Sequence, residues 1–140
     1  MSTLVDTSVI VRAVVGAHED HEPVAAWLRA HLTRTSVVTS THALAETFNV
    51  LSGRMQVPHA ECRRLVARIR REFQLVSLAQ GDYADAIEMT MNAGRSGPTV
   101  YDALHVVAAN KAGATRVAAC DARSFPFLLP PSRFFNPLDP

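Results

Sequence analysis

The chain has 140 residues, a length that fits one domain and can bury a single hydrophobic core. Apolar residues make up 48% and charged residues 19%, which is ordinary globular composition and excludes a disordered or fibrous chain. The formal net charge of +1 neither favours nor opposes a nucleic-acid partner, because the distribution of charge decides that question. We therefore treat residues 1–140 as one domain with one functional site.

The two cysteines and the N-terminal segment bear on the cellular compartment. Cys62 and Cys120 are far apart and have no C-x-x-C spacing, so we expect neither a disulfide framework nor a zinc site. No basic segment followed by a long apolar run opens the chain, and no run approaches the roughly 18 apolar residues of a membrane span. The sequence predicts a cytoplasmic protein without a signal peptide or membrane contact.

Strand and helix patterns alternate along the whole chain. Short β-branched or apolar runs predict strands, and apolar residues at helical spacing predict helices. In chain order, the sequence predicts a strand at 3–5, helices at 9–15 and 21–32, a strand at 36–39, helices at 43–51 and 58–73, a strand at 75–78, helices at 82–93 and 99–113, a strand at 116–120 and a short edge strand at 132–136. This alternation is typical of a parallel sheet covered on both faces by helices, with right-handed crossovers.

Two acids share one position relative to the predicted sheet. Asp6 follows the first strand and Asp121 follows the strand at 116–120, each before an expected helix start. Because ligands bind beyond the carboxyl ends of the strands in open parallel sheets, we expect both acids in one crevice. The alternative role for each is a helix N-cap, a position that Asp favours.

Two further acids lie in helices. Asp102 falls in the first turn of a helix that is apolar on nearly every side, so its charge needs a partner. Thr99 precedes it with the spacing of a capping box, and this local explanation stays open. Glu46 lies well inside its helix, where capping is excluded and an isolated carboxylate on a packed face is costly. Its alternatives are a salt bridge to an arginine such as Arg12 or Arg54, or exposure at the rim.

The four acids together indicate more than any one of them. Carboxylates that converge repel one another, and a hard divalent cation relieves that repulsion. Mg²⁺ and Mn²⁺ prefer oxygen ligands, and Mg²⁺ keeps several waters that can take part in chemistry. We therefore expect Asp6, Glu46, Asp102 and Asp121 to bind Mg²⁺ or Mn²⁺ in a site built for phosphate esters.

Basic and histidine residues have local interpretations. Lys111 is the only lysine among the 14 basic residues, and five arginines fall between Arg63 and Arg71. This run is interpreted as a solvated helix face, and contact of residues 63–71 with RNA stays open. Residues 18–21, with the sequence HEDH, are expected in a loop because their spacing is poor for zinc. His105 is expected to be a core histidine bonded to backbone, with a role beside Asp102 as the alternative.

Four segments resemble the motifs of PIN-domain ribonucleases, in the same order along the chain. LVDTSVI at 4–10 is similar to the opening strand, where an acid is followed by a small hydroxyl residue. AETFNVL at 45–51 resembles the helix with the second acid, and YDALHVVAA at 101–109 resembles the family's Asp-Ala pair in an alanine-rich helix. CDARSF at 120–125 resembles the fourth motif, although Ala119 stands where Thr or Ser is common. The resemblance is closest to the VapC toxins of toxin–antitoxin pairs.

The resemblance implies a PIN-like three-layer α/β/α sandwich with a mainly parallel central sheet of four to five strands. It implies endonucleolytic cleavage of RNA, with the four acids as catalytic metal ligands, and it implies a VapB-type antitoxin and a homodimer. Candidate RNA phosphate contacts are Ser8, Arg12, Arg54, Arg95 and Arg123. Ser8 has a helix N-cap as its alternative role, and each arginine has a surface charge as its alternative.

Other readings of the same residues stay open. A PIN-fold module that binds RNA or protein without cutting would also keep these acids. Phosphoryl transfer of the haloacid-dehalogenase or receiver type is disfavoured, because Ser8 stands where the first needs a second Asp and the only lysine lies in a predicted helix. The apolar stripe and the aromatic tail fit the core, a dimer seam or an antitoxin contact: Leu65, Ile69, Phe73, Phe134 and Phe135.

Overall fold

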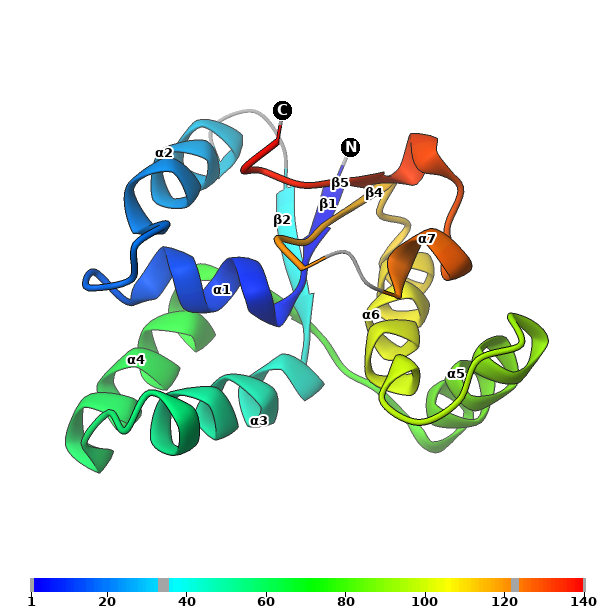
Figure 1. The fold of residues 1–140 in the computed structure, drawn as a ribbon, viewed down its shortest axis with the longest axis horizontal. Coiled ribbons are helices and arrows are strands. Elements are labelled where there is room, and N and C mark those ends of the chain that lie inside the picture. Colours follow the sequence, from blue (N-terminus) through cyan, green and yellow to red (C-terminus); the bar gives the residue numbers. More distant parts are fainter. Residues whose placement is uncertain (1, 33–35, 122–123, 140) are drawn as a thin grey trace.

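A five-stranded sheet forms the centre of the computed structural model, which describes residues 2–32, 36–121 and 124–139. The strand order is β3-β2-β1-β4-β5, and all neighbouring strands run parallel (Figure 1). The strands are β1 (Ser2–Val5), β2 (Ser36–Ser40), β3 (Gln74–Val76), β4 (Arg116–Ala118) and β5 (Phe134–Phe135). The predicted parallel sheet is confirmed, with five strands.

Helices cover both faces of this sheet (Figure 1). One layer contains α1 (Thr7–Val14), α2 (His21–Leu32), α3 (His42–Asn49), the π-helix η1 (Val50–Arg54) and α4 (His59–Glu72). The other layer contains α5 (Gln80–Asn92), α6 (Thr99–Ala112) and α7 (Phe125–Leu128), and the 3-10 helix η2 (Pro131–Arg133) leads into β5. The arrangement is the expected three-layer α/β/α sandwich.

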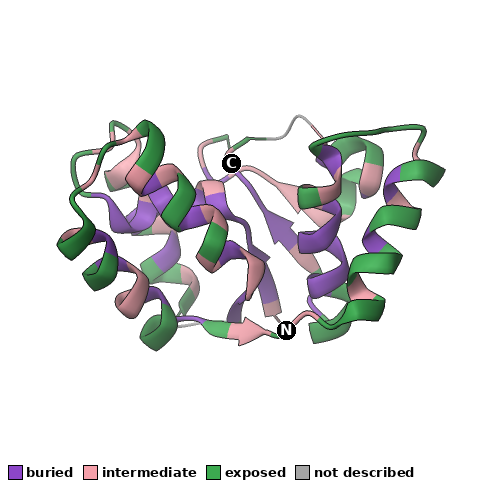
Figure 2. Ribbon diagram, turned by 90° about the horizontal axis from the view of Figure 1, so that it is seen from below, coloured by how far each residue is buried: buried purple, intermediate pink, exposed green. Residues whose placement is uncertain are grey.

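Successive strand residues pack against opposite helix layers. Val5 and Ala118 belong to the core beneath α1–α4, whereas Leu4, Val38 and Val117 belong to the core beneath α6 and α7. Leu4 pairs with Val38 on one side and with Val117 on the other, so each core includes neighbouring strands. All five residues are at most 2% exposed. The central strands are therefore buried on both faces, as parallel strands between helices must be (Figure 2).

The strand order reverses beside β1. The chain runs from β1 to β2 and β3 on one side, and then crosses to β4 and β5 on the other. In open α/β sheets, ligands bind at the carboxyl ends of the strands where the order reverses, which here lies between β1 and β4. The Asp6 N–H donates to the Ala118 carbonyl at 3.1 Å, so the two strands stay paired up to the first acid.

Two strands stop short of their predicted ends because side chains take over the backbone donors. β4 stops before Cys120, whose N–H donates to Ser8 Oγ at 2.9 Å. β3 stops before Leu78, whose N–H donates to Thr41 Oγ1 at 3.3 Å. Hydroxyl groups offer backbone N–H groups an alternative to the sheet ladder, and period-2 patterns do not reveal this competition.

The apolar stripe of α4 belongs to the core. Leu65, Ile69 and Phe73 are 3%, 0% and 5% exposed and pack with the α1–α4 layer, which leaves no free seam on this helix face. Two arginines of the basic run form ion pairs within α4, Arg64 with Glu61 and Arg68 with Glu72. These pairs support the interpretation of residues 63–71 as a solvated helix face.

The aromatic tail packs against the domain instead of extending from it. The Phe134 ring stacks on Phe125 with centroids 5.6 Å apart, and the Phe135 ring lies 5.2 Å from Trp27. The predicted edge strand at 132–136 is shorter than expected, because η2 occupies its start. Among the described residues, no helix is both long enough and apolar enough to cross a membrane.

Candidate active site

The four predicted acids are electrostatically coupled around Asp102. Asp6 follows β1, Glu46 lies in α3, Asp102 lies in the first turn of α6, and Asp121 follows β4. The charge of Asp102 contributes to raising the pKa of Asp6. The charges of Glu46 and Asp121 contribute to raising the pKa of Asp102. The carboxyl edge of the sheet therefore brings Asp6, Glu46 and Asp121 within electrostatic reach of Asp102.

Asp6 is the most buried of these acids, with 5% of its surface exposed. Its Oδ1 accepts hydrogen bonds from Ser8 Oγ at 2.6 Å and from the Val9 N–H at 3.3 Å, so it also caps α1. Burial raises the pKa of Asp6 to about 6, although His105, Ser8 and the Val9 amide act in the opposite direction. The N-cap alternative is thus confirmed. Its hydrogen bonds compensate only part of the cost of burying an ionised carboxylate, so the pKa of Asp6 stays raised.

Ser8 connects the two strand ends that flank the reversal of the sheet. Its hydroxyl donates to Asp6 Oδ1 at 2.6 Å and accepts from the Cys120 N–H at 2.9 Å. The hydroxyl therefore ties the segment after β1 to the segment after β4, which carries Asp121. In this structure Ser8 orients Asp6, whereas a contact with RNA phosphate stays a prediction.

Glu46 is held by two histidines. Its Oε1 lies 3.0 Å from His105 Nε2 and 3.6 Å from His42 Nε2, and its side chain is 28% exposed. The alternative from the sequence was a salt bridge to an arginine such as Arg12 or Arg54, but the ion pairs of Glu46 in the described part of the chain are with the two histidines. Arg12 instead donates from Nε to Asp20 and from NH1 to the Ser8 carbonyl, at 3.3 and 3.0 Å.

His105 lies in the core of α6 with 1% of its surface exposed. Burial alone would lower the pKa of His105, but the hydrogen bond and charge of Glu46, followed by the charges of Asp6 and Asp102, raise it. Nε2–H donates to Glu46, and Nδ1 has no hydrogen-bond partner among the described residues. The expected bond to backbone is therefore wrong. His105 contacts a candidate metal ligand, as the alternative proposed, but that ligand is Glu46 and not Asp102.

Asp102 is partly buried beside α7. Burial raises the pKa of Asp102, while a hydrogen bond from Ser124 lowers it. The capping box with Thr99 does not form, because α6 begins at Thr99 with Pro98 as its cap. Thr99 Oγ1 instead lies 3.3 Å from Ser124 Oγ. The spacing of residues in the sequence did not reveal Ser124 as a partner of Asp102, because the two residues meet only when α7 packs beside α6.

Asp121 and two of the candidate arginines, Arg54 and Arg95, are exposed. Asp121 is exposed and does not directly follow a strand, because β4 ends earlier than predicted. Arg95 is exposed and its guanidinium lies 4.1 Å from the centre of the Phe127 ring. Arg54 is exposed at the end of η1, and Arg123 lies outside the described residues. Contacts of these arginines with phosphate stay predictions.

The donor chemistry fits a hard divalent cation. Carboxylate oxygens are the ligands that Mg²⁺ and Mn²⁺ prefer. Burial, with a smaller contribution from neighbouring acids, raises the pKa values of Asp6 and Asp102, so a bound cation would stabilise their ionised forms. Within the described residues, no three His, Cys, Asp or Glu side chains are arranged to hold a metal ion. The carboxylates point instead to their serine and histidine partners, so a ligand cage would need side-chain rotation.

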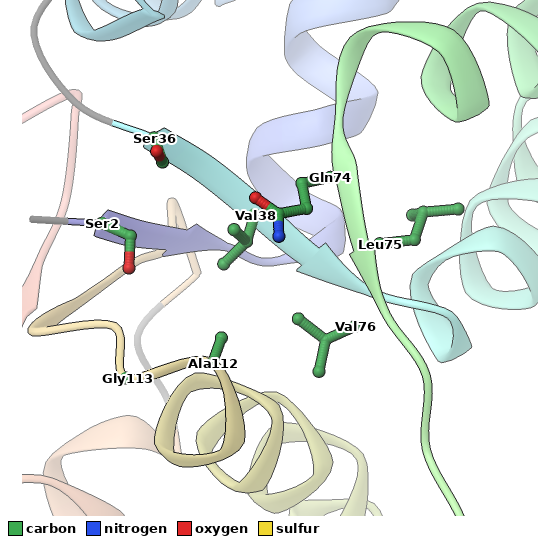
Figure 3. A pocket seen from close by; sticks show the side chains of 8 residues that line it. All are labelled: Ser2, Ser36, Val38, Gln74, Leu75, Val76, Ala112 and Gly113. Carbon is green, nitrogen blue, oxygen red and sulfur yellow. The ribbon is translucent and has the colours of Figure 1, made fainter.

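A pocket of about 520 Å³ lies at the opposite edge of the sheet (Figure 3). Its lining includes Ser2, Ser36 and Gln74 at the starts of β1, β2 and β3, together with Gly113 at the end of α6. No lining side chain is ionisable, so the pocket offers neither a carboxylate ligand nor an acid–base group. The four candidate acids lie toward the carboxyl edge instead.

The family follows from comparison of the sequence with family models. Residues 3–126, most of the chain, match the model of the PIN domain. The chain belongs to the PIN-domain family. PIN domains in general use divalent metal ions, which agrees with the carboxylate donor set described above.

Solved structures share this PIN fold. VapC20 from Mycobacterium tuberculosis, described as a sarcin-ricin loop cleaving toxin, has a TM-score of 0.73 and 19% identity, over 89% of this chain and 93% of that chain. VapBC2 from Rickettsia felis, bound to a promoter DNA fragment, has a TM-score of 0.73 and 14% identity, over 97% and 98%. FitAcB from Neisseria gonorrhoeae has a TM-score of 0.68 and 21% identity, over 97% and 98%. Comparison with curated proteins gives no match.

Proposed function

We propose that this PIN domain is a metal-dependent endoribonuclease of the VapC toxin type. The observation that carries the proposal is the electrostatic coupling of Asp6, Glu46, Asp102 and Asp121 at the reversal of the sheet. The shared fold with VapC20, a toxin that cleaves the sarcin-ricin loop, supports RNA as the substrate. The fold shared with VapBC2, which was solved bound to promoter DNA, supports a VapB-type antitoxin as the partner. A homodimer and a cytoplasmic location belong to the same proposal.

Asp6, Glu46 and Asp102 would hold one Mg²⁺ or Mn²⁺, with Asp121 completing that site or a second one. When bound, such a cation supplies positive charge beside the scissile phosphate and acidifies a water molecule. Ser8 fixes the carboxyl group of Asp6, and His105 fixes that of Glu46. In-line hydrolysis would leave a 5′-phosphate and a 3′-hydroxyl without use of the ribose 2′-OH. Preference for RNA would come from groove shape and access to single-stranded loops.

The test compares cleavage of a structured RNA by the wild type with cleavage by Asp6→Asn and Asp102→Asn. We expect cleavage in Mg²⁺, none in EDTA, and a loss of more than about 100-fold in both variants, beyond the 10- to 100-fold typical of contacts one shell removed from a metal. Asp85→Asn, an exposed acid of α5, is the matched control and should keep full activity. Full activity of Asp6→Asn would reject Asp6 as a metal ligand, whereas RNA binding by the wild type without cleavage would support the non-catalytic module instead.

A further inference from the structure

Three aromatic rings meet beside the candidate active site. His42 lies at the start of α3, Tyr83 lies in α5 and Tyr101 lies in α6, so the rings come from both helix layers. The Tyr101 and His42 rings stack with an interplanar angle of 7° and centroids 5.5 Å apart. The Tyr83 ring stands edge-on to His42 at 6.4 Å and 81°. We call these three residues the aromatic cluster.

The aromatic cluster is joined to the acids. His42 Nε2 lies 3.6 Å from Glu46 Oε1, and Tyr101 directly precedes Asp102 in α6. A ligand that rests on the Tyr101 ring is therefore next to the carboxylates proposed to bind the metal. This position distinguishes the cluster from other exposed aromatic side chains, such as Phe48.

The two tyrosines are exposed although their rings are held in place. Tyr101 is 49% exposed and Tyr83 is 40% exposed. One face of the Tyr101 ring lies against His42, so its exposed surface includes the other face. A ring that is oriented before binding loses little conformational freedom when a flat ligand stacks on it. Nucleobases are such ligands, and single-stranded RNA presents them unstacked.

We propose that an unpaired RNA base stacks on Tyr101, with His42 and Tyr83 holding the platform, while the adjoining phosphate lies at the acids. The inference rests on the proposed endoribonuclease function and names a subsite for its substrate. We infer RNA as the occupant because His42 contacts both the Tyr101 ring, on which a base can stack, and Glu46, which is proposed to bind the metal. An apolar protein partner would pack against the aromatic rings but would make no use of the neighbouring Glu46 carboxylate.

The strongest competing occupant is a second copy of the chain. Ile87 and Met91 continue from Tyr83 along one face of α5 and are 51% and 57% exposed, so this face could lie in a dimer. Ile87→Ala is therefore the control variant, since it changes the face of α5 without touching the aromatic cluster. The oligomeric state of every variant is measured by light scattering.

The experiment measures binding of two single-stranded RNA hexamers in Ca²⁺, a hard cation that also takes oxygen ligands. One hexamer is all uridine, and the other has the same ribose phosphates without bases. We expect the wild type to bind the uridine hexamer about 5- to 150-fold more tightly than the abasic one, the range for one stacked base. Tyr101→Leu should lose most of this preference, whereas Tyr101→Phe and Ile87→Ala should keep it.

Either of two binding results would overturn the proposal: no base preference in the wild type, or a base preference in Tyr101→Leu equal to that of the wild type. If the base preference is unaltered and both Tyr101→Leu and Ile87→Ala also change from dimer to monomer, the rings belong to an interface between copies of the chain. Cleavage in Mg²⁺ is measured separately. If the base preference depends on Tyr101 but no cleavage occurs, the proposed nuclease function is rejected and the proposed base-stacking subsite stands.

Discussion

His105 Nε2 lies 3.0 Å from Glu46 Oε1, so the fully buried centre of α6 is bonded directly to the acid on α3. The two residues are far apart in the sequence and belong to helices in different layers. The bond fixes a partly exposed carboxylate from a rigid core position. A residue in this position orients a ligand without touching the substrate.

We expect His105→Leu to weaken Mn²⁺ binding about 10- to 100-fold, the usual effect of losing a contact that orients a metal ligand. His105→Gln, which keeps an N–H donor, should recover part of the affinity. Titration calorimetry of the metal-free protein with MnCl₂ measures both. Equal Mn²⁺ affinity in the wild type and His105→Leu, with both proteins folded, would show that the bond only supports packing.

The raised pKa of Asp6 predicts how stability depends on pH in EDTA. Because the folded state binds the proton more tightly than the unfolded state, its stability falls as pH rises from about 4 through 6. The difference between 3.8 and about 6 corresponds to about 3 kcal/mol at neutral pH. Asp6→Asn keeps the acceptor for Ser8 and Val9 and removes this charge.

We therefore expect Asp6→Asn to be more stable than the wild type at pH 7.5 in EDTA, and to lose that advantage at pH 4. Urea unfolding at the two pH values measures the difference. The raised pKa of His105 acts in the same direction, and because the charge of Asp6 is one of its smaller causes, the comparison reports Asp6 together with its coupling to His105. A stability difference that does not change with pH would contradict the burial of a charged Asp6.

Ser8→Ala should destabilise the domain by about 1–3 kcal/mol, because the Cys120 N–H and the Asp6 carboxyl group both lose a partner. Activity should fall as well, since Asp6 loses its orientation. Ser52→Ala is the matched control: its hydroxyl donates to the Phe48 carbonyl on an exposed helix, and its loss should cost less than about 0.5 kcal/mol. If Ser8→Ala and Ser52→Ala unfold at the same urea concentration, the hydrogen bonds of Ser8 to Asp6 and Cys120 do not stabilise the domain as proposed.

Arg95→Ala should weaken RNA binding and lower the slope of log affinity against log salt by about 0.7, the value for one contact to a single strand. Arg95 is exposed on the loop before α6, which carries Asp102. Arg64→Ala removes a charge that is also exposed but pairs with Glu61 on α4, and its slope should match the wild type. Fluorescence anisotropy of a labelled RNA at four salt concentrations gives both slopes, and an unchanged slope in Arg95→Ala excludes that contact.

Local patterns predicted the sheet and the position of its acids well. Short β-branched runs located β1, β2 and β4, and the parallel order places Asp6 at the carboxyl edge as expected. The partners of the acids were mostly missed. His42 stands one turn before Glu46, so helical spacing could have identified it, whereas His105 and Ser124 reach their acids only through packing of separate helices.

The most direct test of the central claim is anomalous diffraction from a crystal soaked in MnCl₂. We predict one strong manganese peak at the carboxyl edge of the sheet, with oxygens of Asp6 and Asp102 within about 2.0–2.2 Å, after rotation of their side chains. A saturated crystal with no peak there, or with peaks only at surface acids such as Asp139, would contradict the proposed metal centre.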